Sequence, residues 1–161
     1  MPTAYLFFAG DGANDPNDLI KMMDYFELGD YRFIMGIRQY VHENIFERLK
    51  RTLPNRGLGL YCRLLGGQLF KDLGPLRLIE RNLFRQMKLR EEVWGWTIEA
   101  QLRAAQLNED ILAFSIREKP RLAGFQKVSG VSAWRSAMIG LKIIQAGWRC
   151  KKRGLIEKAG N

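Results

Sequence analysis

Residues 5–18 read YLFFAGDGANDPND, and this stretch decides the fold class. Its first five residues are continuously apolar, which is typical of a buried strand. Glycines and short polar residues follow and mark a tight loop. Asp15 and Pro16 then supply a helix N-cap and a first helical residue. The stretch predicts a strand, a loop and a helix, with Asp11 just past the carboxyl end of the strand.

The same alternation continues along the chain. Apolar periodicity and turn signals predict further strands at 31–36, 76–79 and 111–116, and helices at 16–28, 42–65, 80–87, 97–107 and 132–148. Pro54 and Gly57 are expected to break or kink the second helix. Strands that alternate with helices favour the α/β class, and no repeat, low-complexity segment or linker divides the chain.

Two helices have apolar faces that the spacing assigns to the core. Leu19, Ile20, Met23 and Phe26 share one side of the first helix. On the helix at 97–107 the corresponding inward residues are Ile98, Leu102 and Ala105. Cys62 is expected in the core.

Composition narrows the function classes. The 161 residues include 26 Lys and Arg against 17 Asp and Glu, a net charge of +9. Such a charge favours an anionic partner: nucleic acid, an anionic lipid surface or a phosphorylated small molecule. No RRM, KH or zinc-finger signature is present, so we expect no nucleic-acid partner. One His and two Cys argue against a zinc cluster, a disulfide framework and a His-based nucleophilic triad.

The sequence also predicts a cytoplasmic location. The N-terminus lacks a basic region with a cleavage site, and unpaired cysteines suit a reducing compartment. The most apolar stretch, 131–148, is interrupted by Arg135 and Lys142, so we expect no membrane-spanning helix.

Asp11 is the first residue that could carry chemistry. Ligands of open α/β sheets bind beyond the carboxyl ends of the strands. A carboxylate there can hold Mg²⁺ or Mn²⁺ that bridges substrate phosphates. In the alternative interpretation, Asp11 and Asp15 serve only the turn and the helix cap.

Five motifs resemble the family-two glycosyltransferases of the GT-A fold, in the branch of polyprenyl- and dolichyl-phosphate sugar synthases. Residues 9–16, AGDGANDP, are similar to the D-A-D-G-x-x-D-P metal motif of that family. FIMGIR at 33–38 and DLGPLR at 72–77 are similar to F-V-x-G-S-R and D-L-G-P-F-R. GWTIEAQ at 95–101 and RLAGFQKVSG at 121–130 are similar to G-W-T-V-E-M-Q and R-x-G-x-S-K-V-S-G. The resemblance runs from about Tyr5 to Trp148.

The resemblance implies a role for each matching residue. Asp11 would hold Mg²⁺ or Mn²⁺, although Ala9 replaces the first Asp of the motif. Glu99 would be the catalytic base for a hydroxyl acceptor; with a lipid-phosphate acceptor it would position groups instead, and it could also only offset the helix dipole. The substrate-binding residues would be Arg38, Asp72, Arg77, Trp96, Arg121, Lys127 and Ser129. Alternatively, Arg38 and Lys127 are solvated, Asp72 and Arg77 form a structural pair, and Trp94 and Trp96 pack in the core.

The implied reaction is an inverting sugar transfer from a nucleotide sugar to an acceptor such as a polyprenyl phosphate. The family's first half-sheet has no counterpart here, so we expect the C-terminal part of a GT-A domain, a mixed sheet flanked by helices, with impaired activity. The alternative is a non-catalytic remnant or partner subunit that needs a separately encoded N-terminal half. The open edge of the strand at 5–9 could also pair two copies into a homo-oligomer.

The C-terminal segment has its own pattern. We expect residues 1–130 to form the glycosyltransferase part and residues 131–161 an amphipathic basic helix and tail. Apolar residues recur at helical spacing in this segment: Val131, Trp134, Met138, Leu141 and Trp148. Arg135, Lys142 and Arg149 are seven residues apart and share another side. This pattern is typical of a helix that lies peripherally on the cytoplasmic face of an anionic membrane, or of a helix packed on the domain with a solvated basic end.

Overall fold

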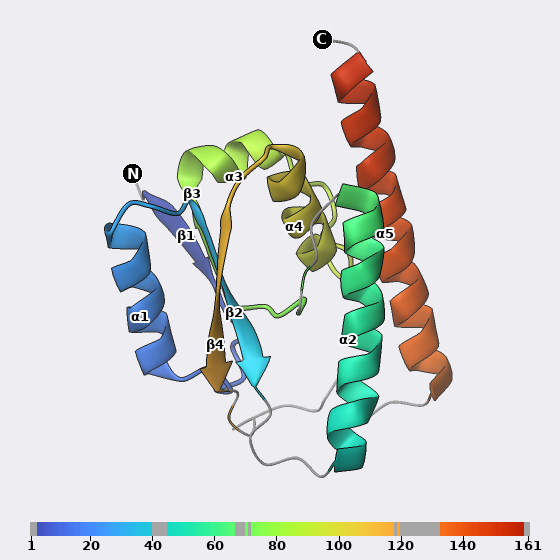
Figure 1. Cartoon of the computed structure of the whole chain (residues 1–161), viewed down its shortest axis with the longest axis horizontal. Coiled ribbons are helices and arrows are strands. Elements are labelled where there is room, and N and C mark those ends of the chain that lie inside the picture. Colours follow the sequence, from blue (N-terminus) through green and yellow to red (C-terminus); the bar gives the residue numbers. More distant parts are fainter. Residues whose placement is uncertain are drawn as a thin grey trace.

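The computed structural model describes residues 3–39, 45–66, 70, 72–117, 119 and 133–159. Their elements are, in chain order, β1 (Ala4–Phe7), α1 (Pro16–Glu27), β2 (Phe33–Gln39), α2 (Ile45–Gly66), β3 (Arg77–Glu80), α3 (Arg81–Met87), α4 (Trp96–Gln106), β4 (Ile111–Arg117) and α5 (Ala133–Ala159) (Figure 1). The predicted α/β class and the order of the elements are confirmed.

The strands form an open, mixed sheet in the order β1-β3-β2-β4. β3 is antiparallel to both of its neighbours, and β2 is parallel to β4. β2 is the best-buried strand, and Phe33, Ile34 and Met35 are almost inaccessible. Helices cover both faces of this strand, which explains why its sequence is apolar without alternation.

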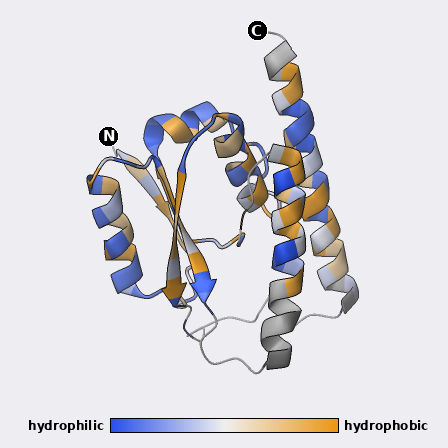
Figure 2. Ribbon diagram, in the orientation of Figure 1, coloured by the Kyte–Doolittle hydropathy of each residue, from blue (hydrophilic) through white to orange (hydrophobic). Residues whose placement is uncertain are grey.

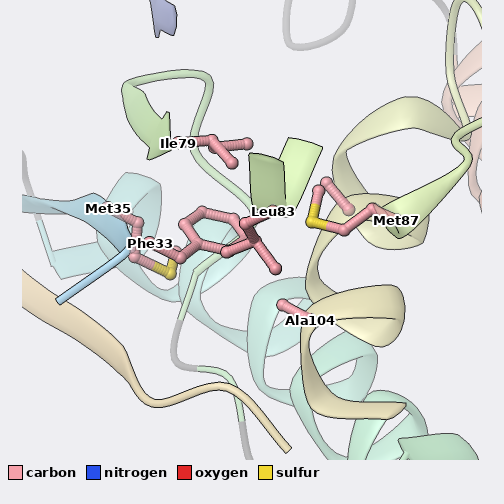
Figure 3. Packing of buried hydrophobic residues seen from close by; sticks show 7 residues of the cluster. Phe33, Met35, Ile79, Leu83, Met87 and Ala104 are labelled. Atoms are coloured by element: carbon pink, nitrogen blue, oxygen red, sulfur yellow. The ribbon is translucent and has the colours of Figure 1, made fainter. Parts of the chain in front are cut away.

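The helices form layers on the two sides of the sheet. α1 covers one face, where Met22 packs with Ile34 and Phe114. α3 and α4 cover the opposite face through Leu83 and Ala104 (Figure 3). α2 and α5 form a further layer beyond α4 (Figure 1). The three residues predicted to face inward on α4 belong to the buried cluster of this layer. The cluster consists of Cys62, Phe70, Ile98, Leu102, Ala105, Ala146 and Cys150.

β1 lies at an edge of the sheet, as the open edge expected for residues 5–9 requires, but it is half-buried rather than fully buried. It pairs with β3 alone among the described strands, and all four of its residues are half-buried. Its side chains are covered on one side by Phe84 and Trp96, which contact Phe7 at ring-centroid distances of 5.6 and 4.7 Å. The continuous apolar run therefore has a local aromatic partner and does not need a central position.

The apolar face of α1 is rotated from its predicted position. Met22 is fully buried, and Leu19 and Phe26 pack beside it. Ile20 and Met23 are instead largely exposed. Residues 19, 22 and 26 form the narrow stripe that the sheet can cover, because α1 is the only helix of the described chain on this face.

α2 is unbroken and α5 is longer than predicted. α2 continues through Pro54, without the break expected there. α5 continues past Trp148 to Ala159, since the following residues hold no Pro and two of them make ion pairs with the domain, namely Arg149 with Glu91 and Arg153 with Glu99.

α5 packs on the domain, but not through the apolar stripe predicted for it. The described members of the predicted stripe, Trp134, Met138, Leu141 and Trp148, are exposed, while Ile139, Ala146 and Cys150 face inward. Val131 lies outside the described residues. Hydrophobic and hydrophilic residues alternate along α2 and α5 (Figure 2). No helix in the described ranges has the length and apolar character needed to cross a bilayer.

Candidate functional site

The topology gathers three predicted site residues at one end of the sheet. β1, β2 and β4 run in the same direction, because β1 and β2 are both antiparallel to β3 while β4 is parallel to β2. The loop that holds Asp11 leaves β1 at this end, and Arg38 lies near the end of β2, where the arrowhead of β4 also lies (Figure 1). Asp72 precedes β3, which enters the sheet here. This is the end at which open α/β sheets bind ligands.

The loop after β1 is held by its own polar side chains. Asp11 Oδ1 accepts a hydrogen bond from the Ala13 backbone N–H at 3.1 Å. The Asn14 side-chain oxygen accepts one from the Ala9 backbone N–H, also at 3.1 Å. Gly12, with φ of 74°, takes a backbone conformation that an L side chain rarely adopts. The loop is therefore shaped without help from a ligand.

Asp15 has the capping role predicted for it. Its side chain accepts from the Asn17 backbone N–H at 3.0 Å, and its other oxygen lies 2.7 Å from Lys119 Nζ. The hydrogen bond from Lys119 lowers the pKa of the Asp15 carboxyl below its usual value. Asp15 is thus committed to α1 and to the segment that follows β4.

The side chains of this loop fit a metal ion that is also bound by a substrate. They do not fit a metal ion whose ligands all come from the protein. No group of three His, Cys, Asp or Glu side chains comes together within the described ranges. Mg²⁺ usually takes one or two carboxylates, completing its shell with water and phosphate oxygens. Asp11 could supply the single carboxylate of such a site.

Asp72 and Arg38 form a bidentate ion pair. Arg38 Nε and Nη2 donate to the two Asp72 oxygens at 2.9 and 2.8 Å, and the Arg38 backbone N–H donates at 3.1 Å. The Leu73 backbone N–H and the Asn55 amide also donate to Asp72. Asp72 is almost fully buried, whereas the Arg38 side chain is about one-quarter exposed. Arg38 is therefore a fixed guanidinium at the rim and not a solvated side chain.

Arg77 is buried and does not pair with Asp72 as one alternative predicted. Its Nε donates to the Gly74 carbonyl at 3.1 Å, and its Nη1 donates to the Thr97 carbonyl at 2.7 Å. Its guanidinium carbon lies 5.3 Å from the centroid of the Trp96 ring. Burial lowers the pKa of the guanidinium to about 9, and the Asp72 charge opposes that shift. Arg77 therefore stays charged at neutral pH, underneath Trp96.

One amino group of Arg77 has no partner within the part of the chain that the structure describes. Nη2 is buried and has no hydrogen-bond acceptor among the described residues. The Gln101 side-chain oxygen is also buried with no described donor, while its Nε2 donates to the Asp72 carbonyl at 2.9 Å. Buried polar atoms without partners are rare and often mark a functional position. Both side chains support the loop at 72–74.

Gln101 was missed by the sequence reasoning, although a signal for it exists. It lies three residues after Ile98 and four before Ala105, so it shares their buried face. A polar side chain on an apolar helix face must find hydrogen-bond partners in the interior. Here it fixes the backbone next to the Arg38–Asp72 pair.

Glu99 is buried away from solvent. Its Oε2 accepts from the backbone N–H groups of Arg90 and Glu91 at 2.9 and 2.7 Å, and its Oε1 pairs with Arg153. The side chain is fully inaccessible. Glu99 connects α4, the loop at 88–95 and α5. This geometry favours a structural role over the role of a base.

The remaining predicted residues divide into two groups. Trp96 is half-buried between Phe7 and Arg77, as the core-packing alternative predicted. Arg121, Lys127 and Ser129 lie outside the described residues.

Comparison of the chain with protein-family models, with curated proteins and with solved structures found no match. Only the residues described above therefore indicate the chemistry of the site. At one end of the sheet they supply a carboxylate on a shaped loop, a fixed guanidinium at the rim and a buried second guanidinium.

A separate depression of about 440 Å³ lies beside the start of α4. Trp94, Lys142 and Arg149 line part of it. Among the predicted site residues that the structure describes, Asp11, Arg38, Asp72, Arg77, Trp96 and Glu99 do not line this depression, so it is distinct from the end of the sheet.

Proposed function

We propose that the chain is part of an inverting glycosyltransferase of family-two type, which transfers a sugar from a nucleotide sugar to a polyprenyl phosphate. The observation that carries the proposal is the convergence of Asp11, Arg38 and Asp72 at the carboxyl ends of the parallel strands. The resemblance of the sequence motifs supplies the reaction type. The sequence motifs and the sheet topology are independent, and they point to the same end of the molecule.

The environment of Glu99 supports a phosphate acceptor. A carboxylate whose oxygens hold two backbone N–H groups and Arg153 is not placed to remove a proton from a hydroxyl group. A phosphate monoester is already ionised at neutral pH, so its oxygen can attack without a base. Among the acceptors that the family resemblance allows, the geometry of Glu99 favours a phosphate.

The reaction forms one bond and breaks one. A phosphate oxygen of the acceptor bonds to the anomeric carbon of the sugar, while the bond from that carbon to the nucleoside diphosphate breaks. The diphosphate leaves with the bonding electrons, and the configuration at the anomeric carbon inverts. Arg38, held by Asp72, would stabilise the charge that develops on the leaving group.

Asp11 is the residue that would hold Mg²⁺ or Mn²⁺ in this site. When bound, the cation would neutralise charge on the diphosphate. The replacement of the motif's first Asp by Ala9 leaves one fewer ligand, so we expect weak metal binding and low activity.

Calorimetric titration of the full chain with UDP and GDP, each with and without Mn²⁺, tests the proposal. We expect one nucleotide to bind, only when Mn²⁺ is present. Asp11→Asn should abolish the dependence on Mn²⁺, whereas Asp24→Asn, at an exposed position of α1, should leave it unchanged. Ala9→Asp should strengthen Mn²⁺ binding.

Failure of the folded chain to bind either nucleotide would contradict the proposal. That result would favour the alternative of a non-catalytic partner that needs a second polypeptide. Equal effects of Asp11→Asn and Asp24→Asn would show that the loop after β1 is not the metal site.

A further inference from the structure

α2 and α5 leave a row of large apolar side chains exposed. The exposed members, which we call the outer face, are Leu53, Leu60 and Leu64 on α2 and Trp134, Met138, Leu141, Ile144, Trp148, Leu155 and Ile156 on α5. Trp134 is 75% exposed and Leu64 is 70% exposed. Single exposed apolar residues are common on protein surfaces, but a contiguous set of this size marks a site of interaction.

The two helices lie side by side, so their exposed residues form one surface. The Tyr61 hydroxyl donates to the Ile144 carbonyl at 2.7 Å, and Lys151 Nζ donates to the Leu64 carbonyl at 3.3 Å (Figure 1). Cys62 of α2 and Cys150 of α5 point into the same buried cluster. The sides of the helices that bear the leucines and tryptophans therefore point outward together.

The apolar row follows the helical repeat of α5. Leu141, Trp148 and Leu155 are seven residues apart and lie on one stripe. Lys142 and Arg149 follow two of them by one residue and lie beside the stripe, on the side away from α2. On α2 the exposed Arg56 and Arg63 occupy the corresponding outer side.

Nearly all of the net charge of the chain belongs to these two helices. Residues 53–66 and 134–156 contain eight Lys and Arg and no Asp or Glu, whereas the rest of the chain has 18 basic and 17 acidic residues. Two of the eight, Arg149 and Arg153, pair with Glu91 and Glu99. Even without these two pairs, the surface is apolar in the middle and basic at its margins.

We propose that the outer face docks on an anionic lipid bilayer, with its leucines and tryptophans in the interfacial region and its basic side chains at the headgroups. Helices of this composition lie in the interface without spanning it. Basic groups next to an anionic surface add to the binding.

Charge argues for lipid over the other occupants. A second copy of the chain would bring one basic face against another, which electrostatic repulsion opposes. A nucleic acid would match the charge but would leave the apolar row in contact with water. An anionic bilayer matches both the charge and the apolar row. The inference does not depend on the proposed glycosyl transfer.

Co-sedimentation of the full chain with vesicles tests this proposal. The vesicles are phosphatidylcholine alone, or phosphatidylcholine with phosphatidylglycerol, and they contain no polyprenyl phosphate. We expect binding to the anionic vesicles that weakens as salt rises. The pair Leu141→Ser with Trp148→Ser should weaken it at least about tenfold. The pair Lys142→Glu with Lys152→Glu should weaken it at least about 30-fold, because each basic group contributes about a factor of five.

Two matched pairs serve as controls, and circular dichroism establishes that every variant is folded. Ile20→Ser with Leu28→Ser removes exposed apolar side chains from α1, which lies across the sheet from α5. Arg85→Glu with Lys88→Glu reverses two exposed charges at the end of α3. Both pairs should bind vesicles as the wild type does.

Three outcomes would overturn the proposal. The first is a folded chain that does not bind the anionic vesicles. The second is an equal loss of binding in the control pairs. The third is a dimer, seen by sedimentation velocity, that Leu141→Ser with Trp148→Ser dissociates while vesicle binding is unchanged; that result would assign the outer face to a second copy of the chain.

Discussion

Removal of the Glu99 carboxylate should destabilise the whole domain. Glu99 accepts hydrogen bonds from the backbone of the loop at 88–95 and pairs with Arg153 of α5. Glu99→Ala leaves the part-buried backbone N–H groups of Arg90 and Glu91 without their acceptor. It also separates α4 from the C-terminal half of α5.

The expected loss of stability follows from the number of hydrogen-bond partners of Glu99. A buried donor left unsatisfied costs about 1–3 kcal/mol. The side chain of Arg153 is about one-fifth exposed, so water can replace part of its ion pair and that contribution is small. We expect Glu99→Ala to lower the free energy of unfolding by about 3 kcal/mol. Glu99→Gln keeps an oxygen that can accept both backbone N–H groups, so it should lower that free energy by less than about 1 kcal/mol. For a chain of this length each kcal/mol lowers Tm by about 2–4 °C.

Urea denaturation followed by circular dichroism measures the effect. Glu92→Gln is the matched control, because Glu92 is exposed and belongs to the same loop, and it should change the free energy of unfolding by less than about 0.5 kcal/mol. A Glu99→Ala variant as stable as the control would refute the reasoning. A variant that is stable but has lost sugar transfer would restore the role of Glu99 as a base.

Other positions give independent predictions. A Cβ at Gly95 would lie 2.5 Å from the Ala146 Cβ, so Gly95→Ala should destabilise the protein by about 1–3 kcal/mol in the same urea assay. A Cβ at Gly140 would have no atom within 4 Å, so Gly140→Ala should be neutral or should stabilise the protein by up to about 1 kcal/mol. Burial raises the pKa of the Cys62 and Cys150 thiols to about 12 and about 11, so iodoacetamide should label them slowly in the folded chain and rapidly in urea; fast labelling of the folded chain would contradict the structure. The hydrogen bond from the Arg149 guanidinium lowers the pKa of Glu91, so its stabilisation is present above about pH 4.5 and is lost as the pH falls through the lower folded-state pKa; Glu91→Gln should flatten that part of the stability profile.

The order of strands and helices was predictable because each element carries its own local signal. Pro16 after Asp15 starts α1 as expected, and the apolar run at 33–35 forms the central strand. Ile98 and Leu102 face the core as their spacing predicts. Such signals need no knowledge of distant residues.

The sides on which helices pack were less predictable. α5 has apolar residues on most of its circumference, so periodicity alone does not choose between Leu141 and Ile139 as the inward residue. The choice depends on the close approach of α4, which admits Ala146 and excludes larger side chains. The pairing of β1 with β3 was likewise not predicted, because no local signal specifies the partner of a strand.

The candidate site was predictable as a set of positions but not as a set of contacts. Arg38 and Asp72 are 34 residues apart, and Glu99 and Arg153 are 54 apart. Ion pairs over such separations are created by the fold. The sequence motifs therefore selected the candidate residues, while the contacts of these residues came from the tertiary structure.

The two sides of α5 should differ in how freely their sequence can change. A Cβ at Gly147 would lie 3.0 Å from side-chain atoms of Ile98, Leu65 and Tyr61, so the inner side tolerates no added volume. The outer side contacts solvent, and folding there depends little on size. A saturation library of α5, scored once for abundance in the cell and once for membrane association, would separate the requirements of folding from those of binding within a single helix.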